Sequence, residues 1–199
     1  MKAEPLVTPA GQPVAGPLLI TPDVYGDTRG YFLESWNERR WGELLAAQGQ
    51  QAQSFVQDNH SRSSQGVLRG LHWQIPPQPQ GKLVRCVLGE IFDVAVDLRR
   101  SSATFGQWVV ARLSAGNHHQ LWVPVGFAHG FLTLSEQAEV LYKTTAFWDR
   151  DCERSLHWND ANLAIAWPTE ALAASPIELS DKDAVAPQLH TIDPSDLFA

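Results

Sequence analysis

The feature that most constrains this chain is a run of short apolar segments in which side chains alternate with a period of two. From Phe55 onward these segments include KLVRCVLGEIFDVAVDLR, QWVVARL, QLWVPV, GFLTL and EVLYKTTAFW, and Gly, Pro, Ser or Asn separates them. A period of two places successive side chains on opposite faces of a strand. Many short strands at this spacing are typical of an antiparallel sandwich or barrel. We therefore expect an all-β jelly-roll barrel with a few short peripheral helices.

The longest alternating segment, KLVRCVLGEIFDVAVDLR, divides into two runs around Leu88-Gly89-Glu90. In the second run Asp93 and Asp97 share one face, and the other face carries Phe92, Val94, Val96 and Leu98. Two such runs joined by a glycine predict a hairpin.

One helix is indicated near the start of the chain. Ser35 and Glu38 have the spacing of a capping box, the apolar residues that follow have helical spacing, and Gly49 ends the pattern. Residues 1–17 contain four prolines, so we expect an extended N-terminal arm rather than a regular element. Residues 18–199 then form a single jelly-roll domain, whose C-terminal tail of short helices and loops is broken at Pro168, Pro176 and Pro187.

Charge and composition exclude several classes of partner. The chain has 199 residues, with 15 Lys and Arg against 22 Asp and Glu, so its formal charge is −7. We expect no nucleic-acid partner, and a phosphate on a ligand must meet a local basic cluster. No segment has the length of an apolar membrane span and the N-terminus lacks an apolar signal core, so we expect no membrane partner and a cytoplasmic location. Cys86 lies in an apolar alternating run and Cys152 in the polar stretch DRDCER, so neither a disulfide nor a CxxC metal site is indicated and we expect reduced thiols.

The densest group of polar residues lies in FVQDNHSRSSQGVLRGLHWQ. In extended chain, Gln57 and Asn59 share one face, and His72 and Gln74 share another. Together with Arg69, these faces are suited to line the mouth of a barrel. Taken alone, a single histidine in a strand such as His72 is more often a satisfied core or surface residue than a catalyst.

Further along the chain, four more side chains are candidates for a site. Lys82 opens an apolar strand and His129 lies between glycines and aromatic residues, although a solvated strand end and a packing histidine are open alternatives. Tyr142 belongs to a strand, and Trp148 falls on the same face by even spacing. Either aromatic residue is also consistent with core packing.

A metal site is the alternative for histidines in a small jelly roll. Cupins often bind metal through His-x-His, a nearby glutamate and a histidine in Pro-x-Gly-x-x-His. Here His129 keeps the last motif, but Gln74 stands where a second histidine would follow His72, and no acidic residue lies between His72 and Glu90. Two histidines without a carboxylate make a poor divalent-metal site, so we expect no metal and disfavour a metal-dependent oxygenase.

Several motifs together resemble the dTDP-4-dehydrorhamnose 3,5-epimerase family: NHSRSSQGVLRGLHWQ, QGKLVRCVLGEIFDVAVDLRRSSATFGQW, QLWVPVGFAHGF, LYKTTAFW and ELSDKDAVAP. The resemblance covers about residues 20–190. It implies a cupin-like homodimer and an isomerase without a cofactor. The implied reaction converts dTDP-4-dehydro-6-deoxy-D-glucose to dTDP-4-dehydro-L-rhamnose, in the dTDP-rhamnose biosynthesis that serves carbohydrates such as lipopolysaccharide.

The resemblance also assigns roles to the candidate residues. His72 matches the family's base, Asp183 the carboxylate that orients the base, and Tyr142 the proton donor, while Lys82 lies near the developing enolate oxygen. Without the resemblance, Ser180 and Asp183 have only the spacing of a capping box. The matching substrate-binding positions are Arg29, Glu34, Gln57, Asn59, Arg69, His129, Trp148, Glu153 and Lys182, with tryptophan where the family commonly has a tyrosine that stacks on thymine.

Two other functions fit the same residues. A single-centre epimerase or a 3,4-ketoisomerase acting on a related dTDP-4-keto sugar would differ in which hydrogens exchange with solvent. A nucleotide-sugar binding module without turnover would need neither the base nor the proton donor.

Overall fold

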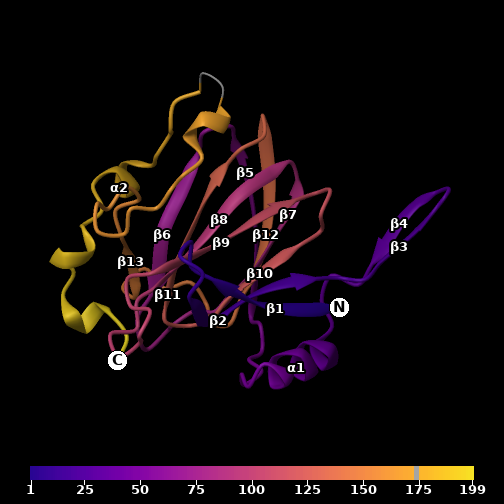
Figure 1. Cartoon of the computed structure of the whole chain (residues 1–199), viewed down its shortest axis with the longest axis horizontal. Coiled ribbons are helices and arrows are strands. Elements are labelled where there is room, and N and C mark those ends of the chain that lie inside the picture. Colours follow the sequence, from indigo (N-terminus) through magenta and orange to yellow (C-terminus); the bar gives the residue numbers. More distant parts are fainter. Residues whose placement is uncertain (173–174) are drawn as a thin grey trace.

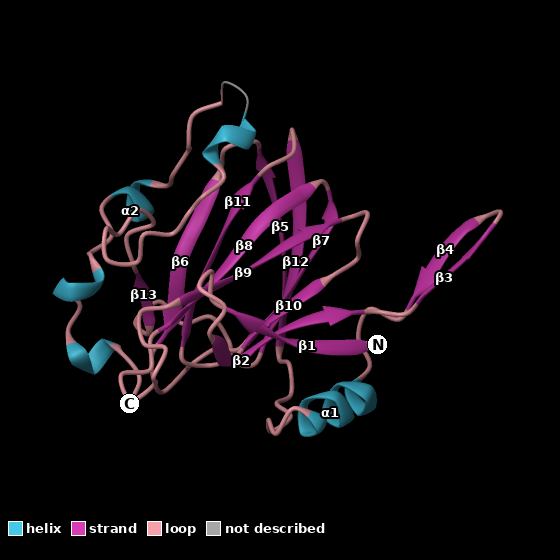
Figure 2. Cartoon of the chain, viewed as in Figure 1, coloured by secondary structure: helices cyan, strands magenta, loops and turns pink. Residues whose placement is uncertain are grey.

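The fold is built from two antiparallel sheets (Figures 1 and 2). The computed structural model describes residues 1–172 and 175–199. The six-stranded sheet contains, in spatial order, β1 (Lys2–Val7), β2 (Pro13–Thr21), β10 (Gln120–Val123), β7 (Lys82–Leu88), β12 (Gln137–Thr144) and β5 (Gln57–Ser64). The five-stranded sheet contains β13 (Glu153–Ser155), β6 (Leu68–Gln74), β11 (Phe127–Thr133), β8 (Glu90–Asp97) and β9 (Trp108–Ser114). The expected all-β class is confirmed.

A hydrophobic core fills the space between the two sheets. Val84 and Val140 come from the six-stranded sheet, and Ile91 and Phe131 come from the five-stranded sheet. Period-two alternation turns these side chains inward, which explains why the apolar runs are short and regular. Each large apolar side chain that is fully buried contributes about 1.5–3 kcal/mol to stability.

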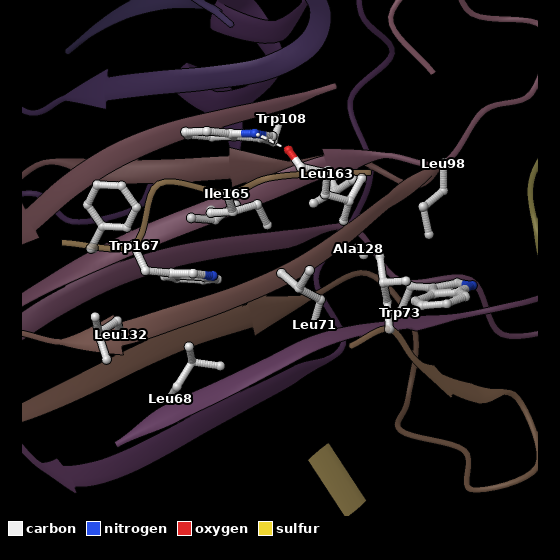
Figure 3. Close-up of a cluster of buried hydrophobic side chains, with 14 of the residues drawn as sticks. Leu68, Leu71, Trp73, Leu98, Trp108, Ala128, Leu132, Leu163, Ile165 and Trp167 are labelled. Atoms are coloured by element: carbon white, nitrogen blue, oxygen red, sulfur yellow. Dashed lines mark hydrogen bonds between the residues drawn. The ribbon is translucent and has the colours of Figure 1, made fainter. Parts of the chain in front are cut away.

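The five-stranded sheet is buried on its other face as well. Val94 and Val96 point to this outer face, where the segment after β13 packs over them with Leu163, Ile165 and Trp167. The indole of Trp108 donates a hydrogen bond to the carbonyl of Leu163, at 3.0 Å (Figure 3). Because both faces of the sheet are covered, the side chains of β8 are buried on both faces of the strand.

Helix α1 (Glu38–Ala47) covers part of the outer face of the six-stranded sheet. Its buried residues, Trp41 and Leu45, pack against Leu18, Ile20 and Trp122 of the sheet. The helix was expected with Ser35 as its cap, but Asn37 is the N-cap and accepts a hydrogen bond from the backbone N–H of Arg40. Asparagine is as good a cap as serine, so spacing alone could not choose between them.

The predicted hairpin between β7 and β8 is wrong. The two strands belong to different sheets, and the chain crosses from one sheet to the other at Gly89. This glycine has φ +73°, and a Cβ atom there would lie 2.1 Å from the carbonyl oxygen of Gln137. Periodicity shows which side chains share a face, but it does not identify the neighbouring strand.

The expected absence of a regular element in residues 1–17 is also wrong. Strand β1 lies at the edge of the six-stranded sheet and pairs with β2, mainly with residues 18–21 and through Val7 with Pro13. Pro5 is tolerated because it lies in the edge strand, and Pro13 because it is the first residue of β2.

Two regions extend from the two sheets. A hairpin of β3 (Val24–Asp27) and β4 (Gly30–Leu33) projects away from them (Figure 1). The C-terminal tail wraps the opposite side with η1 (Thr169–Leu172), α2 (Asp181–Ala184), η2 (Leu189–Thr191) and η3 (Pro194–Asp196). Among the described residues, none of the helices is long and apolar enough to cross a bilayer.

Candidate active site

Two neighbouring cavities form one cleft in the molecule. The larger has a volume of about 410 Å³ and the smaller about 300 Å³. Both are lined by His72, Lys82 and Tyr142, so these three side chains lie where the two cavities meet. The structure thus brings together residues that are far apart in the sequence.

The strands explain this convergence. Tyr142 of β12 is paired with Asn59 of β5 on one side and with Val84 of β7 on the other. Lys82 begins β7, and His72 lies in β6 of the opposite sheet. Inward-facing positions from both sheets therefore meet in the cleft.

The imidazole ring of His72 is hydrogen-bonded to Asp183, whose side chain is nearly fully buried. The distance from Nε2 of His72 to Oδ1 of Asp183 is 2.6 Å. Asp183 lies in α2, where Ser180 is the N-cap and accepts a hydrogen bond from the backbone N–H of Asp183. Ser180 caps the helix through the backbone N–H of Asp183, and the carboxylate of Asp183 contacts His72, so one residue takes part in both contacts.

The charge state of Asp183 follows from its surroundings. Burial alone would raise the pKa of its carboxyl group, but the hydrogen bond and charge of His72, helped by Ser180 and the backbone of Gly70, bring the pKa below its ordinary value. Asp183 therefore stays ionised, and an ionised carboxylate at this distance fixes the orientation of the imidazole ring.

Lys82 is almost completely buried beside the histidine. Its Nζ atom donates a hydrogen bond to the carbonyl oxygen of His72 at 3.3 Å. Burial lowers the pKa of Lys82 to about 8, against the opposing effect of the carboxylates of Glu153 and Asp93. A poorly solvated cation interacts strongly with any negative charge that develops nearby.

Tyr142 completes the central group. Burial raises the pKa of its hydroxyl group, Arg69 opposes this shift and Glu153 adds to it. The hydroxyl group is therefore protonated at neutral pH and able to donate a proton or a hydrogen bond.

A second histidine–aspartate pair lies on the next strand. His129 of β11 is paired with His72 of β6, and its Nε2 atom lies 2.6 Å from Oδ1 of Asp93 in β8. His129 lines the larger cavity, whereas Asp93 is completely buried. Asp93 was expected on a strand face but not as a site residue; the signal that could have identified it is a carboxylate inside the apolar run IFDVAVD.

The smaller cavity has the polar and aromatic groups expected for a nucleotide. The amide of Gln57 donates to Asn59 and accepts from the backbone N–H of Trp148, which confirms that Gln57 and Asn59 share a face. Trp148 lies beyond the end of β12 at Thr144, so its expected place on that strand is wrong, but its half-exposed ring still lines this cavity.

Cationic side chains gather around the larger cavity. Lys182 forms an ion pair with Glu153 at 2.6 Å, which joins α2 to β13. The Nε atom of Arg69 donates to the hydroxyl group of Ser63 at 2.9 Å. With Lys82, these side chains form the local basic cluster that the acidic chain needs to bind a phosphate.

Two of the expected site residues lie outside the cleft of their own chain. Arg29 is on the β3–β4 hairpin, where its exposed side chain is paired with Asp27. Glu34 follows the hairpin and contacts Asn37 and Arg40. Neither residue lines one of the two cavities.

The side chains of the cleft form an acid–base set and not a set of metal ligands. Among residues 1–172 and 175–199, no group of three His, Cys, Asp or Glu side chains is arranged to hold a metal ion. The cleft combines an imidazole oriented by a carboxylate, a protonated phenol and a buried ammonium group. Such a set is suited to removing and returning a proton beside a group that gains negative charge.

Comparison with known proteins agrees with this chemistry. Residues 12–191 match the family described as dTDP-4-dehydrorhamnose 3,5-epimerase. The enzyme of that name from Pseudomonas aeruginosa is 60% identical over 166 residues, which is 83% of this chain and 87% of the relative. The crystal structure of the 3,5-epimerase from Legionella pneumophila, in complex with dTDP-4-keto-L-rhamnose, superposes with a TM-score of 0.88 at 46% identity, covering 98% of this chain and 97% of that one.

A more distant structure has a different named activity. ChmJ, a 3'-monoepimerase from Streptomyces bikiniensis, has a TM-score of 0.81 at 30% identity and covers 96% of this chain and 88% of its own. The match of the family over most of the sequence, together with the 60% identical relative, decides the assignment. The chain belongs to the dTDP-4-dehydrorhamnose 3,5-epimerase family.

Proposed function

We propose that this protein is the 3,5-epimerase that converts dTDP-4-dehydro-6-deoxy-D-glucose to dTDP-4-dehydro-L-rhamnose in dTDP-L-rhamnose biosynthesis. The observation that carries the proposal is the His72–Asp183 pair in the same cleft as Lys82 and Tyr142. The names of the relatives support the same substrate and reaction.

The reaction needs one base and one acid near a ketone. The C4 keto group acidifies the hydrogens on C3 and C5, because either carbanion is delocalised onto the C4 oxygen as an enolate. His72 removes the proton, and Asp183 stabilises the imidazolium that forms. Tyr142 returns a proton to the other face of the carbon, and the charge of Lys82 stabilises the enolate oxygen. Each cycle removes and returns one proton, so no redox cofactor is required.

The remaining cleft residues bind the nucleotide and the diphosphate. Arg69 and Lys182 are placed to contact the diphosphate, since arginine offers paired hydrogen bonds and lysine a compact charge. Trp148 offers a large aromatic face for the thymine ring, and Gln57, Asn59 and Glu153 supply polar contacts in the same cavity. His129 lines the cavity that receives the sugar.

The active enzyme is a homodimer in this proposal. The β3–β4 hairpin projects from the two sheets and exposes Tyr25, Tyr31 and Phe32. An exposed aromatic hairpin is costly unless another surface covers it. A second copy of the chain would cover the hairpin. Arg29 and Glu34, which lie outside the cleft of their own chain, would then reach the cleft of that second copy. We place the enzyme in the cytoplasm, where the free, buried thiols of Cys86 and Cys152 are stable.

The decisive experiment is incubation of the purified protein with dTDP-4-dehydro-6-deoxy-D-glucose in heavy water, followed by NMR of the sugar. Deuterium at both C3 and C5 with formation of the L-sugar is the expected result. Deuterium at one carbon would indicate a single-centre epimerase, and migration of the keto group would indicate a ketoisomerase. Binding of dTDP without any exchange would indicate a binding module.

A Tyr142→Phe variant tests the assignment of the proton donor. The change removes the hydroxyl group but keeps the ring, so formation of the L-sugar should fall by about 10²-fold while dTDP affinity stays within about twofold. A large loss of dTDP binding instead would make Tyr142 a binding residue.

A further inference from the structure

The buried pair of His129 and Asp93 is unusual for a structural contact. Asp93 has no exposed surface, and only its Oδ1 atom is hydrogen-bonded, to His129. Its Oδ2 atom is buried and has no hydrogen-bond partner among the described residues. A buried carboxylate with one unsatisfied oxygen costs stability, and an apolar side chain of similar size would avoid that cost.

The neighbouring Asp97 shows how this strand satisfies a carboxylate that has a structural role. Asp97 lies on the same face of β8 and is also completely buried. Its two oxygens accept hydrogen bonds from Arg99, Ser102 and Thr104. Among the residues that the structure describes, Asp93 has one hydrogen-bond partner, His129, and His129 lines the cleft.

The hydrogen bond determines how the imidazole of His129 faces a ligand. A carboxylate accepts a hydrogen bond, so the Nε2 atom of His129 carries a proton. The structure gives its Nδ1 atom no hydrogen-bond partner among the described residues, although the ring lines the larger cavity. In the neutral ring Nδ1 is then an acceptor.

We propose that Asp93 is a positioning residue of the active site, which holds His129 in its Nε2–H form so that Nδ1 accepts a hydrogen bond from a hydroxyl group of the bound sugar. The inference rests on the proposed function for the identity of the sugar, but the tautomer of His129 does not. In this proposal the buried pair of His129 and Asp93 contributes to specificity, whereas His72 and Asp183 act on the reacting carbons.

The first test uses the wild-type protein and needs no substrate. A long-range proton–nitrogen NMR spectrum of protein labelled in its histidines, with a His129→Gln variant to assign the signal, shows which ring nitrogen carries the proton. We expect His129 in the Nε2–H form. Observation of the Nδ1–H form would overturn the proposal, whatever the enzymatic activity.

The second test separates a positioning role from a structural one. Asp93→Asn removes the charge and can both accept and donate, so it no longer selects one tautomer. We expect kcat/KM to fall about 10- to 100-fold, as when the carboxylate behind a ligating histidine is lost from a metal site, with dTDP affinity unchanged within about twofold. The matched control is Asp97→Asn, which should lower Tm but leave the His129 signal in place and kcat/KM within about threefold.

The third test identifies the ligand group. Substrate analogues that lack the 2-hydroxyl or the 3-hydroxyl group are compared with the full sugar as ligands of wild type and Asp93→Asn. One analogue should lose affinity in wild type and lose much less in the variant. Equal losses of affinity in both proteins for both analogues would overturn the proposal. It would also be overturned if Asp93→Asn and Asp97→Asn lost activity in the same proportion to their loss of Tm. If wild type shows no exchange in heavy water, the proposed function fails, and the tautomer measurement still judges the pair.

Discussion

The two histidine–aspartate pairs have the same length but different surroundings. Both have a distance of 2.6 Å from Nε2 to the carboxylate, and the two histidines face each other across β6 and β11. The side chain of His72 is 26% exposed, whereas that of His129 is 9% exposed. The open pair receives its carboxylate from the C-terminal tail, and the sealed pair from the neighbouring strand.

This difference indicates which pair does acid–base chemistry. A base must reach its substrate, so the more accessible His72 suits proton transfer. A carboxylate held in the sheet is rigid, so Asp93 suits the fixing of a ring. The same two residue types therefore have different roles because of access and of the element that carries the carboxylate.

The largest expected effect comes from removing the base of the open pair. In His72→Ala no imidazole remains at that position, so deuterium exchange at both C3 and C5 should fall by about 10³-fold or more. His190→Ala, a change of an exposed histidine in η2, is the control and should leave exchange unchanged. Substantial exchange in His72→Ala would show that the two pairs have been assigned the wrong roles.

Lys82 interacts with both histidine–aspartate pairs. It donates a hydrogen bond to the carbonyl oxygen of His72, and the charge of Asp93 affects its pKa. Lys82→Met should reduce kcat by about 10²-fold, since a fixed charge at the enolate is lost. It should also raise stability at pH 7. The folded protein lowers the pKa of Lys82 from 10.5 to about 8, so the buried charge costs stability below pH 8 and the cost disappears as pH rises towards 10.5.

Thermal unfolding of wild type and Lys82→Met from pH 7 to pH 10.5 measures this effect. The variant should be more stable by at most about 3 kcal/mol at pH 7, and the difference should shrink through the window from pH 8 to pH 10.5. A variant that is less stable at pH 7, with a difference independent of pH, would contradict the assignment.

Asp183→Asn weakens the pair of His72 and Asp183 but keeps the position of both side chains. Ser180 caps α2 through the backbone of Asp183, so the helix keeps its cap in the variant. Loss of the charge should reduce exchange by about 10²-fold, less than loss of the base. An unchanged rate in the heavy-water assay would mean that Asp183 only anchors the tail.

The smallest effect is expected from Ser180→Ala. Loss of this cap costs about 1 kcal/mol locally and loosens the short helix that carries Asp183. Activity should fall a few-fold, while the Tm of the two-sheet core changes little. A matching change at Asp193, the N-cap of η3, should alter stability but not activity, because no residue of η3 lines the cleft.

Local rules predicted much of the fold. Alternation predicted the strands from β5 to β12, because most of these strands bury at least one face, and it correctly placed Gln57 and Asn59 on the same face. It did not predict β13, whose three residues are only partly buried. It did not predict that β7 and β8 lie in different sheets, since strand partners depend on contacts between distant segments. The prolines of residues 1–17 predicted no regular element, yet β1 pairs with β2 there. An edge strand tolerates proline because not all of its N–H groups are needed for hydrogen bonds.

The site was predictable mainly through the family resemblance. Nothing in the spacing of His72 and Asp183 indicates that they meet, because the tail brings the carboxylate back to β6. Arg29 and Glu34 match the family, yet the fold of one chain does not place them in the cleft. Asp93 was visible as a carboxylate in an apolar strand, but its partner His129 lies on another strand.

The crossing at Gly89 has a consequence for the speed of folding. Because β7 does not pair with β8, its first ladders must form with β10 and β12, whose residues come much later in the chain. Closing such long loops before any contact is gained slows the search for the native topology. We expect refolding on a timescale of about milliseconds to seconds, as in other proteins dominated by non-local strand pairing, and not the microseconds of a helical bundle.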